Sequence, residues 1–484
     1  MVAIGLLLIV LDNTILFTVL PTLTDALDAS YAQGLWVINI YSLVLTGLLP
    51  GTGTLGDRIG HRRMYLSGLV VFGLASLAAA FSPSVTALIA ARAALAVGAA
   101  MMMPATLALI RVVFEDERER SLAISVWASF SLLGAVAGPI LGGLLLQHFW
   151  WGSVFLINVP MVILAFCGIL LLGPATQPQP SGRWDWLSSL LAMLALCALV
   201  AGIKELAHPD LHWPRAALAL AVCVVTGWLF SRRQSRLSYP LLDFSLFRNM
   251  AFLSGVLAAV LVTFALGGLQ VAITQRFQWV AGFSPLEAGA LVTAVAVGAL
   301  PTTLLGGLLL HRIGLRSLIA GGLAVGAVGL WLAARLDAGL TPVVSGLILV
   351  GAGLGATISV ASNAIVSNAP AHRAGMASSV EEVAYEFGAL IGVAFIGSLL
   401  AALYAQGLQL PPGAPEAARG YIAEALALAD AHAGLQAAAT QAFDAGYTRV
   451  MQVTAVCLAL GAAFTAWLLR RHGPGSALSP TGPS

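Results

Sequence analysis

Apolar residues form long runs along this chain, each about 18 to 28 residues in length and bounded by glycine, proline or charged residues. A helix rises 1.5 Å per residue and the hydrocarbon core of a bilayer is about 30 Å thick, so each run predicts a membrane-spanning helix. We expect fourteen such helices, near residues 2–23, 33–54, 64–81, 84–112, 121–147, 152–173, 186–206, 214–231, 251–275, 286–310, 315–335, 341–367, 378–404 and 447–470.

The runs are grouped as six, two and six. We therefore expect an all-α membrane protein with a six-helix bundle at 1–173, two additional helices with flanking loops at 174–249, and a second six-helix bundle at 250–470. The second bundle contains a long outer loop at 405–447, whose Ala-rich middle is either a cap over the outer mouth or a loosely ordered loop. Residues 471–484 are predicted to be a tail.

A short motif occurs once in each six-helix group. The stretch from Gly53 to Arg62 (GTLGDRIGHR) recurs from Gly307 to Arg316 (GLLLHRIGLR), both times between the second and third helices of the group. This repeat predicts two related halves, and a binding site between repeated helical bundles is a recurrent plan of secondary transporters.

Composition excludes several other classes of protein. Hydrophobic residues make up 59% of the chain and charged residues only 9%, against about a quarter in soluble proteins. The four cysteines fall inside apolar runs, the eight histidines have no metal-ligand spacing, and no phosphate-binding GxxxxGK or nucleic-acid-binding surface is present. We expect no enzyme activity and no cofactor, so transport would draw on the proton motive force.

The distribution of basic residues predicts the orientation in the membrane. With the N-terminus inside, 16 of the 23 Lys and Arg residues fall on the inner side. The positive-inside rule therefore predicts that both termini lie in the cytoplasm.

Asp12 lies near the middle of the first predicted helix. A charged side chain at this depth costs roughly 3 kcal/mol on insertion scales and is seldom kept without a function. Burial favours the neutral carboxyl group, so we expect Asp12 to take up and release a proton in exchange for a cation. A structural hydrogen bond from a protonated Asp12 to a neighbouring helix is the alternative.

Three acids fall near the start of the predicted helix 378–404. Glu382 and Glu386 are one turn apart and share a face, and Tyr385 lies beside the face of Glu381. Acids beside an aromatic ring suit a lipophilic cation, which gains Coulomb attraction and a cation–π contact. Glu386 is the deepest and the preferred member, and a solvated helix end is the alternative interpretation of Glu381.

The segment between the second and third helices resembles a loop signature of the major facilitator superfamily. Its glycines permit close packing, and its charges are expected to form a relay at an inner gate, with Glu115 and Asp116 as partners for Arg58 or Arg62. A second expected role for Asp57 is to cap the third helix, because a carboxylate is favourable at a helix N-terminus. The predicted gate residues are Gly53, Asp57, Arg58, Gly60, Arg62 and Arg63.

The fifth predicted helix resembles the glycine–proline motif of the antiporters of that superfamily. Small faces let helices approach closely and proline bends a helix, so the resemblance favours exchange over symport. A simple helix-packing motif is the alternative. The motif residues are Gly134, Gly138, Pro139, Gly142 and Gly143.

Across nearly its whole length the chain resembles the fourteen-helix drug:proton antiporter branch, and within it the quaternary-ammonium and methyl-viologen efflux transporters. The resemblance is carried by segments such as Asp12-Asn-Thr-Ile-Leu, Met103-Pro104, Trp151 to Pro160 and Pro240 to Asp243. It implies a role for Arg92 in tuning a carboxylate, although Leu95 and Ala96 depart from the usual motif. Asn39 stands where relatives commonly carry an acid.

These observations together predict a proton-coupled antiporter that exports lipophilic organic cations such as quaternary ammonium compounds, dyes and biguanides. Asp12, Arg92 and the three glutamates would bind the proton or the cation, and Trp36, Asn39, Tyr41 and Tyr385 would line the cavity. We expect a monomer in the bacterial cytoplasmic (inner) membrane. The alternatives are a dedicated exporter of one metabolite or antibiotic and a non-transporting membrane sensor.

Overall fold

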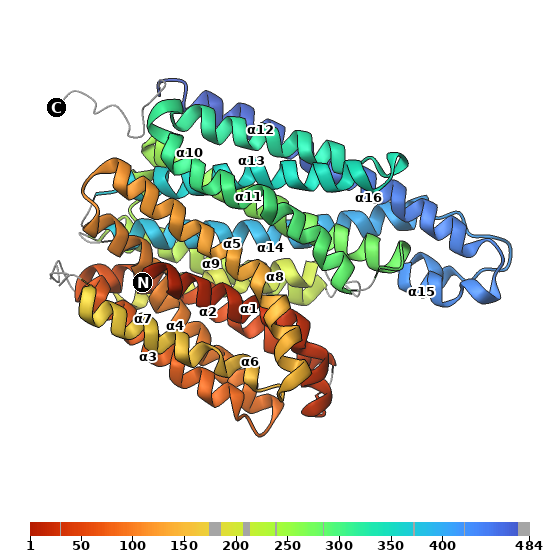
Figure 1. The fold of residues 1–484 in the computed structure, drawn as a ribbon, viewed down its shortest axis with the longest axis horizontal. Helices are drawn as coiled ribbons and strands as arrows, with labels where there is room; N and C mark the ends of the chain where they lie inside the picture. The colour runs from red at the N-terminus through yellow and green to blue at the C-terminus, as the bar shows by residue number, and fades with distance from the viewer. Residues whose placement is uncertain are drawn as a thin grey trace.

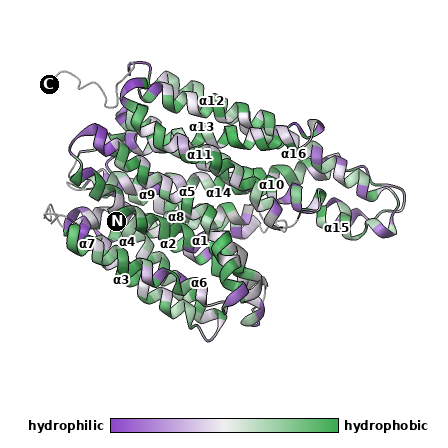
Figure 2. Cartoon of the chain, viewed as in Figure 1, coloured by the Kyte–Doolittle hydropathy of each residue, from purple (hydrophilic) through white to green (hydrophobic). Residues whose placement is uncertain are grey.

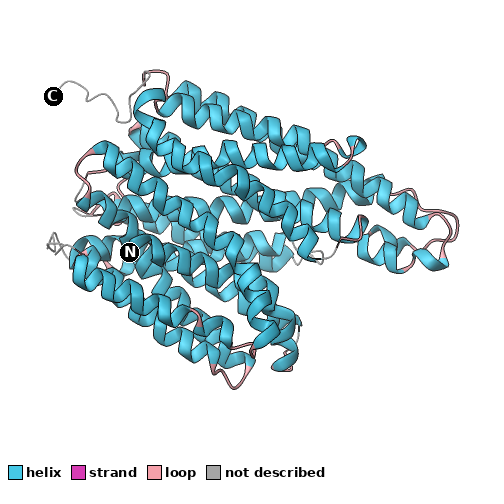
Figure 3. Ribbon diagram, in the orientation of Figure 1, coloured by secondary structure: helices cyan, strands magenta, loops and turns pink. Residues whose placement is uncertain are grey.

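In the part of the chain that the structure describes, helices are joined by loops and turns, and there is no β-strand (Figure 3). This computed structural model describes residues 1–29, 31–173, 185–206, 213–237, 240–283, 285–370, 373–420 and 422–472. Among them, 13 helices are long and apolar enough to cross a membrane. Helix α1, Val2–Ala26, is 25 residues long and begins with the apolar stretch Val2–Leu16. With α1 included, the described helices correspond to the fourteen predicted runs.

The first group of helices, which we call the N-terminal unit, closely follows the predicted runs except at its sixth helix. The predicted helix 152–173 is divided at Ile157. Pro160 has no N–H to donate to the carbonyl of Leu156, so the regular bonding pattern is interrupted at this turn. The helices of the unit after α1 are α2 Tyr31–Ile59, α3 His61–Ala80, α4 Val85–Val113, α5 Glu117–His148, α6 Ser153–Leu156 and α7 Asn158–Leu172.

The remaining helices form an inserted hairpin and a C-terminal unit. The hairpin is α8 Trp186–Leu206 and α9 Trp213–Gln234, followed by the turn η1 Phe244–Arg248. The C-terminal unit consists of α10 Met250–Gln275, the π-helical turn η2 Arg276–Val280, α11 Pro285–Ile313, α12 Leu315–Ala333, η3 Leu336–Ala338, α13 Leu340–Ser367, α14 Ala374–Gly407, η5 Glu416–Arg419, α15 Ile422–Ala427, η6 Ala429–Ala431 and α16 Leu435–Leu468.

The predicted outer loop 405–447 is too long. Helix α14 continues to Gly407 and α16 already begins at Leu435, which leaves only residues 408–434 between them. Alanine-rich sequence has a high helix propensity, so the helix extends past the apolar run that marks the membrane-spanning part. Of the predicted tail 471–484, residues 473–484 lie outside the described part.

Each unit has its own hydrophobic core. Buried apolar side chains of α1 to α7 form one cluster, to which Val366 also belongs, and those of α10 to α16 form another. The two units lie one above the other in Figure 1, with their helices running roughly along the horizontal axis. Hydrophilic residues gather toward the ends of the helices and hydrophobic residues along their middle parts (Figure 2). This distribution is typical of helices embedded in a bilayer.

The repeated motif has the same backbone conformation in both units. Gly60 joins α2 to α3 with a φ of 96°, and Gly314 joins α11 to α12 with a φ of 86°. An L side chain rarely adopts such an angle, so a glycine is required at both turns. The beginning of α1 and the end of α16 lie at the same end of the molecule as these turns, on the left in Figure 1. We call it the gate end.

Candidate functional site

Asp12 lies in a buried cluster of polar groups inside the N-terminal unit. Its side chain on α1 is 1% exposed, and that of Arg92 on α4 is fully buried. Arg92 Nη1 lies 2.5 Å from Asp12 Oδ2, and Asn158 Nδ2 on α7 donates to Asp12 Oδ1 over 2.7 Å. The carboxylate predicted by its charge therefore meets the arginine predicted by resemblance, and each neutralises the charge of the other away from water.

Arg92 is held by further contacts with α2. Its Nε donates to the carbonyl of Val37 over 3.3 Å, and its guanidinium carbon lies 4.4 Å from the centre of the Tyr41 ring. Within the described residues, Arg92 Nη2 and the Tyr41 hydroxyl are buried and form no hydrogen bond. Contacts from α2 and α7 therefore hold the Asp12–Arg92 pair in place. Arg92 Nη2 and the Tyr41 hydroxyl remain able to donate a hydrogen bond.

The glycine-rich face of α5 brings α1 into position. A Cβ at Gly134 would lie 3.0 Å from the carbonyl oxygen of Leu7, and one at Gly138 would lie 2.8 Å from Thr14 Cβ. Thr14 Oγ1 donates to the carbonyl of Gly134 over 3.2 Å. Because these contacts flank Asp12 on both sides, the glycines allow α1 to lie close enough to α5 to fix the position of the carboxylate.

The other motif positions in α5 differ in their surroundings. A Cβ at Gly142 would make ordinary contact with Ile15 and Val19, whereas one at Gly143 would have no atom within 4 Å. Pro139 lies inside the unbroken helix α5. Three of the four predicted glycines therefore face α1.

The acids of α14 form a second buried cluster, in the C-terminal unit. Glu381 is fully buried and Glu382 is 2% exposed. The Ser362 hydroxyl on α13 donates to the Glu381 carboxylate, and the Tyr385 hydroxyl donates to Glu381 Oε1 over 2.9 Å. The interpretation of Glu381 as a solvated helix end is wrong, because α14 begins at Ala374 and Glu381 lies about two turns inside it.

The two remaining acids differ in burial. Glu382 Oε1 is buried and has no hydrogen-bond partner in the described part of the chain. Glu386, one turn farther from the gate end, is half-buried. Glu386 therefore lies deeper along α14 than the other two acids, yet its side chain is the most exposed of the three. Glu381 and Glu382 are both buried.

Tyr41 lies against the Asp12–Arg92 pair. It is fully buried, and the Arg92 guanidinium carbon lies 4.4 Å from the centre of its ring. Of the other predicted cavity residues, Asn39 and Tyr385 are half-buried and Trp36 is 52% exposed. The structure therefore brings Tyr41 to the Asp12–Arg92 pair, and it leaves the Trp36 side chain about half exposed.

The predicted gate segment is largely helical. Helix α2 continues to Ile59, beyond the end of the predicted apolar run at residue 54, because backbone hydrogen bonding does not depend on the hydropathy of the side chains. Only Gly60 therefore separates α2 from α3. Asp57 accepts hydrogen bonds from the backbone N–H groups of Gly375 over 2.8 Å and Met376 over 3.1 Å. The prediction that Asp57 caps the third helix is therefore wrong: its carboxylate caps α14, in the opposite unit.

The charges around Asp57 are arranged differently from the predicted relay. His61 Nε2 lies 3.1 Å from Asp57 Oδ1, and Arg62 Nη2 donates to the carbonyl of Leu170 at the end of α7 over 2.8 Å. Arg58 and Arg63 are exposed. Asp116, a predicted partner of the arginines, caps α5 by accepting from the N–H groups of Arg118 and Glu119.

Further contacts close the gate end between the units. Ser379 Oγ donates to the carbonyl of Leu49 over 2.7 Å, and the hydroxyls of Ser125 and Ser359 lie 2.6 Å apart. Arg120 Nε donates to Ser367 Oγ over 2.9 Å. Together with Asp57, these contacts join α2 to α14 and α5 to α13.

Sequence reasoning did not single out the polar residues that complete the two clusters. Asn158 and Ser362 are uncharged, and residues of their type occur in many helices for packing alone. Asn158 lies within one of the segments that carry the family resemblance, and this was the available signal. Their roles became visible only through contacts that join distant parts of the chain.

Two cavities lie away from the buried clusters. One, of about 800 Å³, is bordered by α12 and α16 and contains the Arg276–Asp444 ion pair in its wall. The other, of about 410 Å³, is apolar and lies among α2, α14 and the inserted hairpin. Neither is lined by Asp12, Arg92 or the three glutamates.

Comparison with known proteins gives concordant results. The sequence profile described as Major Facilitator Superfamily matches residues 2–281 and 251–408. The chain is 38% identical over 488 residues to multidrug efflux pump LfrA of Mycolicibacterium smegmatis, covering 97% of this chain and 95% of that protein. It is 39% identical over 412 residues to methyl viologen resistance protein SmvA of Salmonella typhimurium, covering 84% and 82%.

The fold also has a close counterpart among solved structures. The human organic anion transporter MFSD10 superposes with a TM-score of 0.64 at 16% sequence identity, covering 94% of this chain and 97% of that one. An identity this low shows a shared fold only. The profile match and the two relatives show more: this chain belongs to the Major Facilitator Superfamily, and is a multi-pass membrane transporter rather than an enzyme.

Proposed function

We propose that this protein exports lipophilic organic cations, such as quaternary ammonium compounds, dyes and biguanides, in exchange for protons. It acts as a monomer in the bacterial cytoplasmic membrane with both termini and the gate end facing the cytoplasm. The names of the relatives LfrA and SmvA, a multidrug efflux pump and a methyl viologen resistance protein, support efflux of organic cations.

The observation that carries the proposal is the buried pair of Asp12 and Arg92. Two opposite charges with 1% or less exposure are expensive to bury and add little stability compared with apolar residues. The buried pair is therefore expected to serve the function of the protein rather than its stability. A carboxylate that accepts from an arginine and an amide can exchange these partners for a proton, which is the event that proton coupling requires.

The contacts suggest an order of events. A proton that reaches Asp12 cancels its charge, which weakens the bond to Arg92, while Asn158 continues to hold the other oxygen. The freed guanidinium remains over Tyr41 and keeps its positive charge. The charge released in the N-terminal unit thereby disfavours a cation bound at the acids of α14, and the cation leaves.

Transport also requires the gate end to open and close. The contacts of Asp57, Ser379, Ser125 and Arg120 hold the two units together there. With the gate end in the cytoplasm, this arrangement is closed to the inside. Rocking of the two units would break these contacts to admit the next cation.

The test is proton release driven by drug addition in proteoliposomes that contain the purified protein and a pH-sensitive dye. We expect Glu386→Gln and Asp12→Asn together to reduce coupled flux at least about tenfold, a barrier increase of about 1.4 kcal/mol. The control is Glu424→Gln, which neutralises an exposed acid on α15. Unchanged coupled flux in the double variant would show the scheme to be wrong.

Two further arms keep the test informative. Asp12→Asn leaves Arg92 buried without its charged partner and can unfold the protein, so Glu386→Gln is also measured alone. Competition between chemically unlike cations is expected. Competition by one natural compound only would replace the multidrug proposal with a dedicated exporter, and absence of substrate-dependent proton flux would indicate a sensor.

A further inference from the structure

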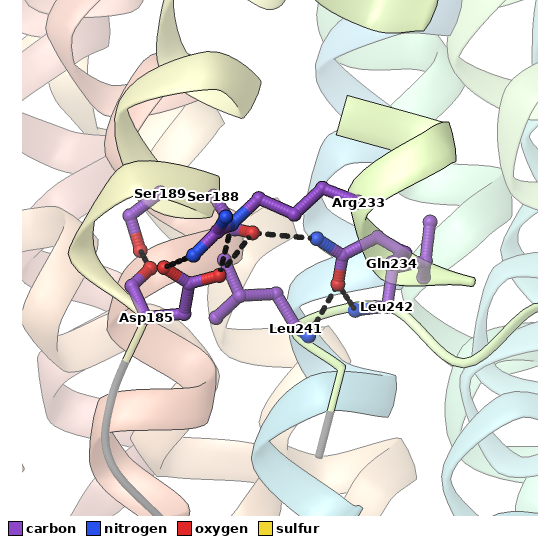
Figure 4. Close-up of polar contacts among 7 residues, drawn as sticks. All are labelled: Asp185, Ser188, Ser189, Arg233, Gln234, Leu241 and Leu242. Atoms are coloured by element: carbon purple, nitrogen blue, oxygen red, sulfur yellow. Dashed lines mark hydrogen bonds and ion pairs between the residues drawn. The ribbon is translucent and has the colours of Figure 1, made fainter. Parts of the chain in front are cut away.

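A polar cluster closes the base of the inserted hairpin (Figure 4). Asp185 precedes α8, and Arg233 lies in the last turn of α9. Arg233 donates from Nε to Asp185 Oδ2 over 2.6 Å and from Nη2 to Oδ1 over 3.0 Å. Ser188 Oγ donates to the same carboxylate over 2.6 Å. Such a two-pronged pair fixes direction as well as distance.

Gln234 joins this cluster to the chain that follows α9. Its side chain is 3% exposed, and Nε2 donates to Ser188 Oγ over 2.8 Å. Its Oε1 accepts from the backbone N–H of Leu241 over 2.6 Å and of Leu242 over 3.3 Å. We call Asp185, Ser188, Arg233 and Gln234 the hairpin clasp, and residues 240–243 the linker.

The linker in turn lies on the start of α14. Asp243 forms an ion pair with Arg373, and its backbone N–H donates to Met376 Sδ over 3.4 Å. Leu241, Leu242 and Met376 line the same apolar cavity of about 410 Å³. The linker therefore touches the turn of α14 that Asp57 caps from α2.

The other side of the hairpin is attached to α2. Cys197 Sγ on α8 lies 3.6 Å from the carbonyl oxygen of Leu43, and a Cβ at Gly47 would lie 2.8 Å from Met193 Cγ. The hairpin thus packs on a helix of the N-terminal unit, while the clasp and linker reach a helix of the C-terminal unit. It crosses the seam that must open at the gate end.

We propose that the hairpin clasp holds the linker against the start of α14 and thereby favours the closed gate, with Gln234 as a positioning residue of the transport cycle. The inserted hairpin is then a working part of the gate. This inference rests on the proposed function only for the rocking of the two units, and not on the identity of the substrate or on proton coupling.

The experiment measures gate opening directly. Spin labels are placed at Ser67 on α3 and Ser317 on α12, which are both exposed and near the gate end, and their separation is measured by double electron–electron resonance without substrate. Gln234→Met removes both the donor and the acceptor at similar size. We expect it to raise the population with a long separation severalfold, whereas Arg236→Gln, at an exposed neighbour, leaves the distribution unchanged.

A reversed pair tests the mechanism further. Asp185→Arg alone is expected to open the gate as Gln234→Met does, and Asp185→Arg combined with Arg233→Asp is expected to restore part of the closed population. A distribution for Gln234→Met equal to that of the unmodified protein would overturn the proposal. So would failure of the reversed pair to recover any closed population.

A disulfide reports whether the hairpin stays in place. Gly47→Cys is expected to form a bond with the native Cys197, because a Cβ at Gly47 would lie 3.0 Å from Cys197 Sγ; the other three cysteines are replaced in this background. An open gate with this bond still forming supports the proposal, and an open gate with the bond lost contradicts it, because the hairpin has then left α2. If the unmodified protein shows no drug-driven proton release while Gln234→Met still lengthens the spin-label distance, the result counts against the proposed function alone.

Discussion

The two copies of the repeated motif close the gate end in different ways. In the N-terminal copy, Gly53 packs against Gly375, and Asp57 caps α14 across the seam between the units. In the C-terminal copy, Gly307 packs against Ser121 and Ser125 of α5 in the same manner. The position of Asp57 is taken there by His311, and α5 is capped by its own Asp116.

The two copies of the motif share a glycine at a close helix contact, and they differ in whether a carboxylate lies at that contact. Both glycines let a helix of one unit approach a helix of the other closely. Only the α2–α14 contact places a carboxylate of one unit on the helix dipole of the other. We infer that the α5–α11 contact acts as a packed pivot, and that the α2–α14 contact is the one that responds to charge.

The largest effect is expected from filling the close approaches. A Cβ at Gly53 would lie 2.9 Å from the carbonyl carbon of Gly375, and one at Gly307 would lie 2.6 Å from the carbonyl oxygen of Ser121. Backbone cannot move aside cheaply, so Gly53→Val and Gly307→Val should each lower drug export by about tenfold or more, an effect of about 1.4 kcal/mol or more. Export is measured as dye accumulation in cells.

The matched control for these variants is Gly321→Val on α12, where an added Cβ would have no atom within 4 Å. It should transport normally. Normal drug export by Gly53→Val or by Gly307→Val would show that transport does not depend on the close helix approach at that glycine.

A smaller effect should distinguish the two copies. Asp57→Asn removes the charge on the α14 dipole and weakens the cap, which we expect to cost about 1 kcal/mol and to raise the open-gate population about fivefold. His311→Asn should change that population by less than about twofold, because α5 has its own cap. The spin-label distance between α3 and α12 measures both. Equal effects would contradict the division into a charged contact and a packed pivot.

The hydroxyl contacts should behave alike on the two sides. Ser379→Ala removes a hydrogen bond to α2, and Ser125→Ala removes one to α13. Each should lower the free energy of unfolding by about 1 kcal/mol. Thermal unfolding in detergent is the measurement. A large inequality would mean that the two contacts differ in more than their charges.

The smallest expected effect concerns acidity. The hydrogen bond from Arg233 lowers the pKa of Asp185 from its ordinary value of 3.8 to about 2, with burial opposing and further hydrogen bonds assisting the shift. Because the folded value is the lower one, this contribution to stability is present above about pH 4 and is lost as the pH falls through about 2.

Acidification from pH 7.5 to 5.5 should therefore leave the hairpin clasp intact. Any change in the spin-label distances over that range should be equally large in the unmodified protein and in Asp185→Asn. A response present only in the unmodified protein would place a proton sensor at the clasp.

The sequence was sufficient to predict the helices and their grouping into two sets of six, because a membrane-spanning helix is identified directly by the length and hydropathy of its apolar run. Helix α4 begins and ends within about a residue of its predicted run. Helix ends were harder to predict: α2 and α16 continue into polar sequence, where backbone bonding still favours helix although hydropathy falls. The broken sixth helix required the hydrogen-bond consequence of Pro160, which length alone does not show.

The sequence identified the charged residues of the candidate site, but it did not show which residues they contact. Asp12 was identified because a charge is costly in a membrane, the glutamates because they share helix faces beside an aromatic ring, and Arg92 from the family resemblance. The bond between Asp12 and Arg92 joins residues 80 positions apart, and that between Asp12 and Asn158 joins residues 146 apart. Helical periodicity relates near neighbours only, so it found Tyr385 beside Glu381 but neither of these long-range bonds.

The distance in sequence between Asp12 and Arg92 also has a consequence for biosynthesis. The ribosome adds Asp12 80 residues before it reaches Arg92, so the nascent chain presents an acid to the membrane while its basic partner has not yet been made. The neutral acid is the cheaper form to insert. We therefore expect Asp12 to enter the bilayer carrying a proton and to release it when α4 arrives, so that its first deprotonation is a step of assembly.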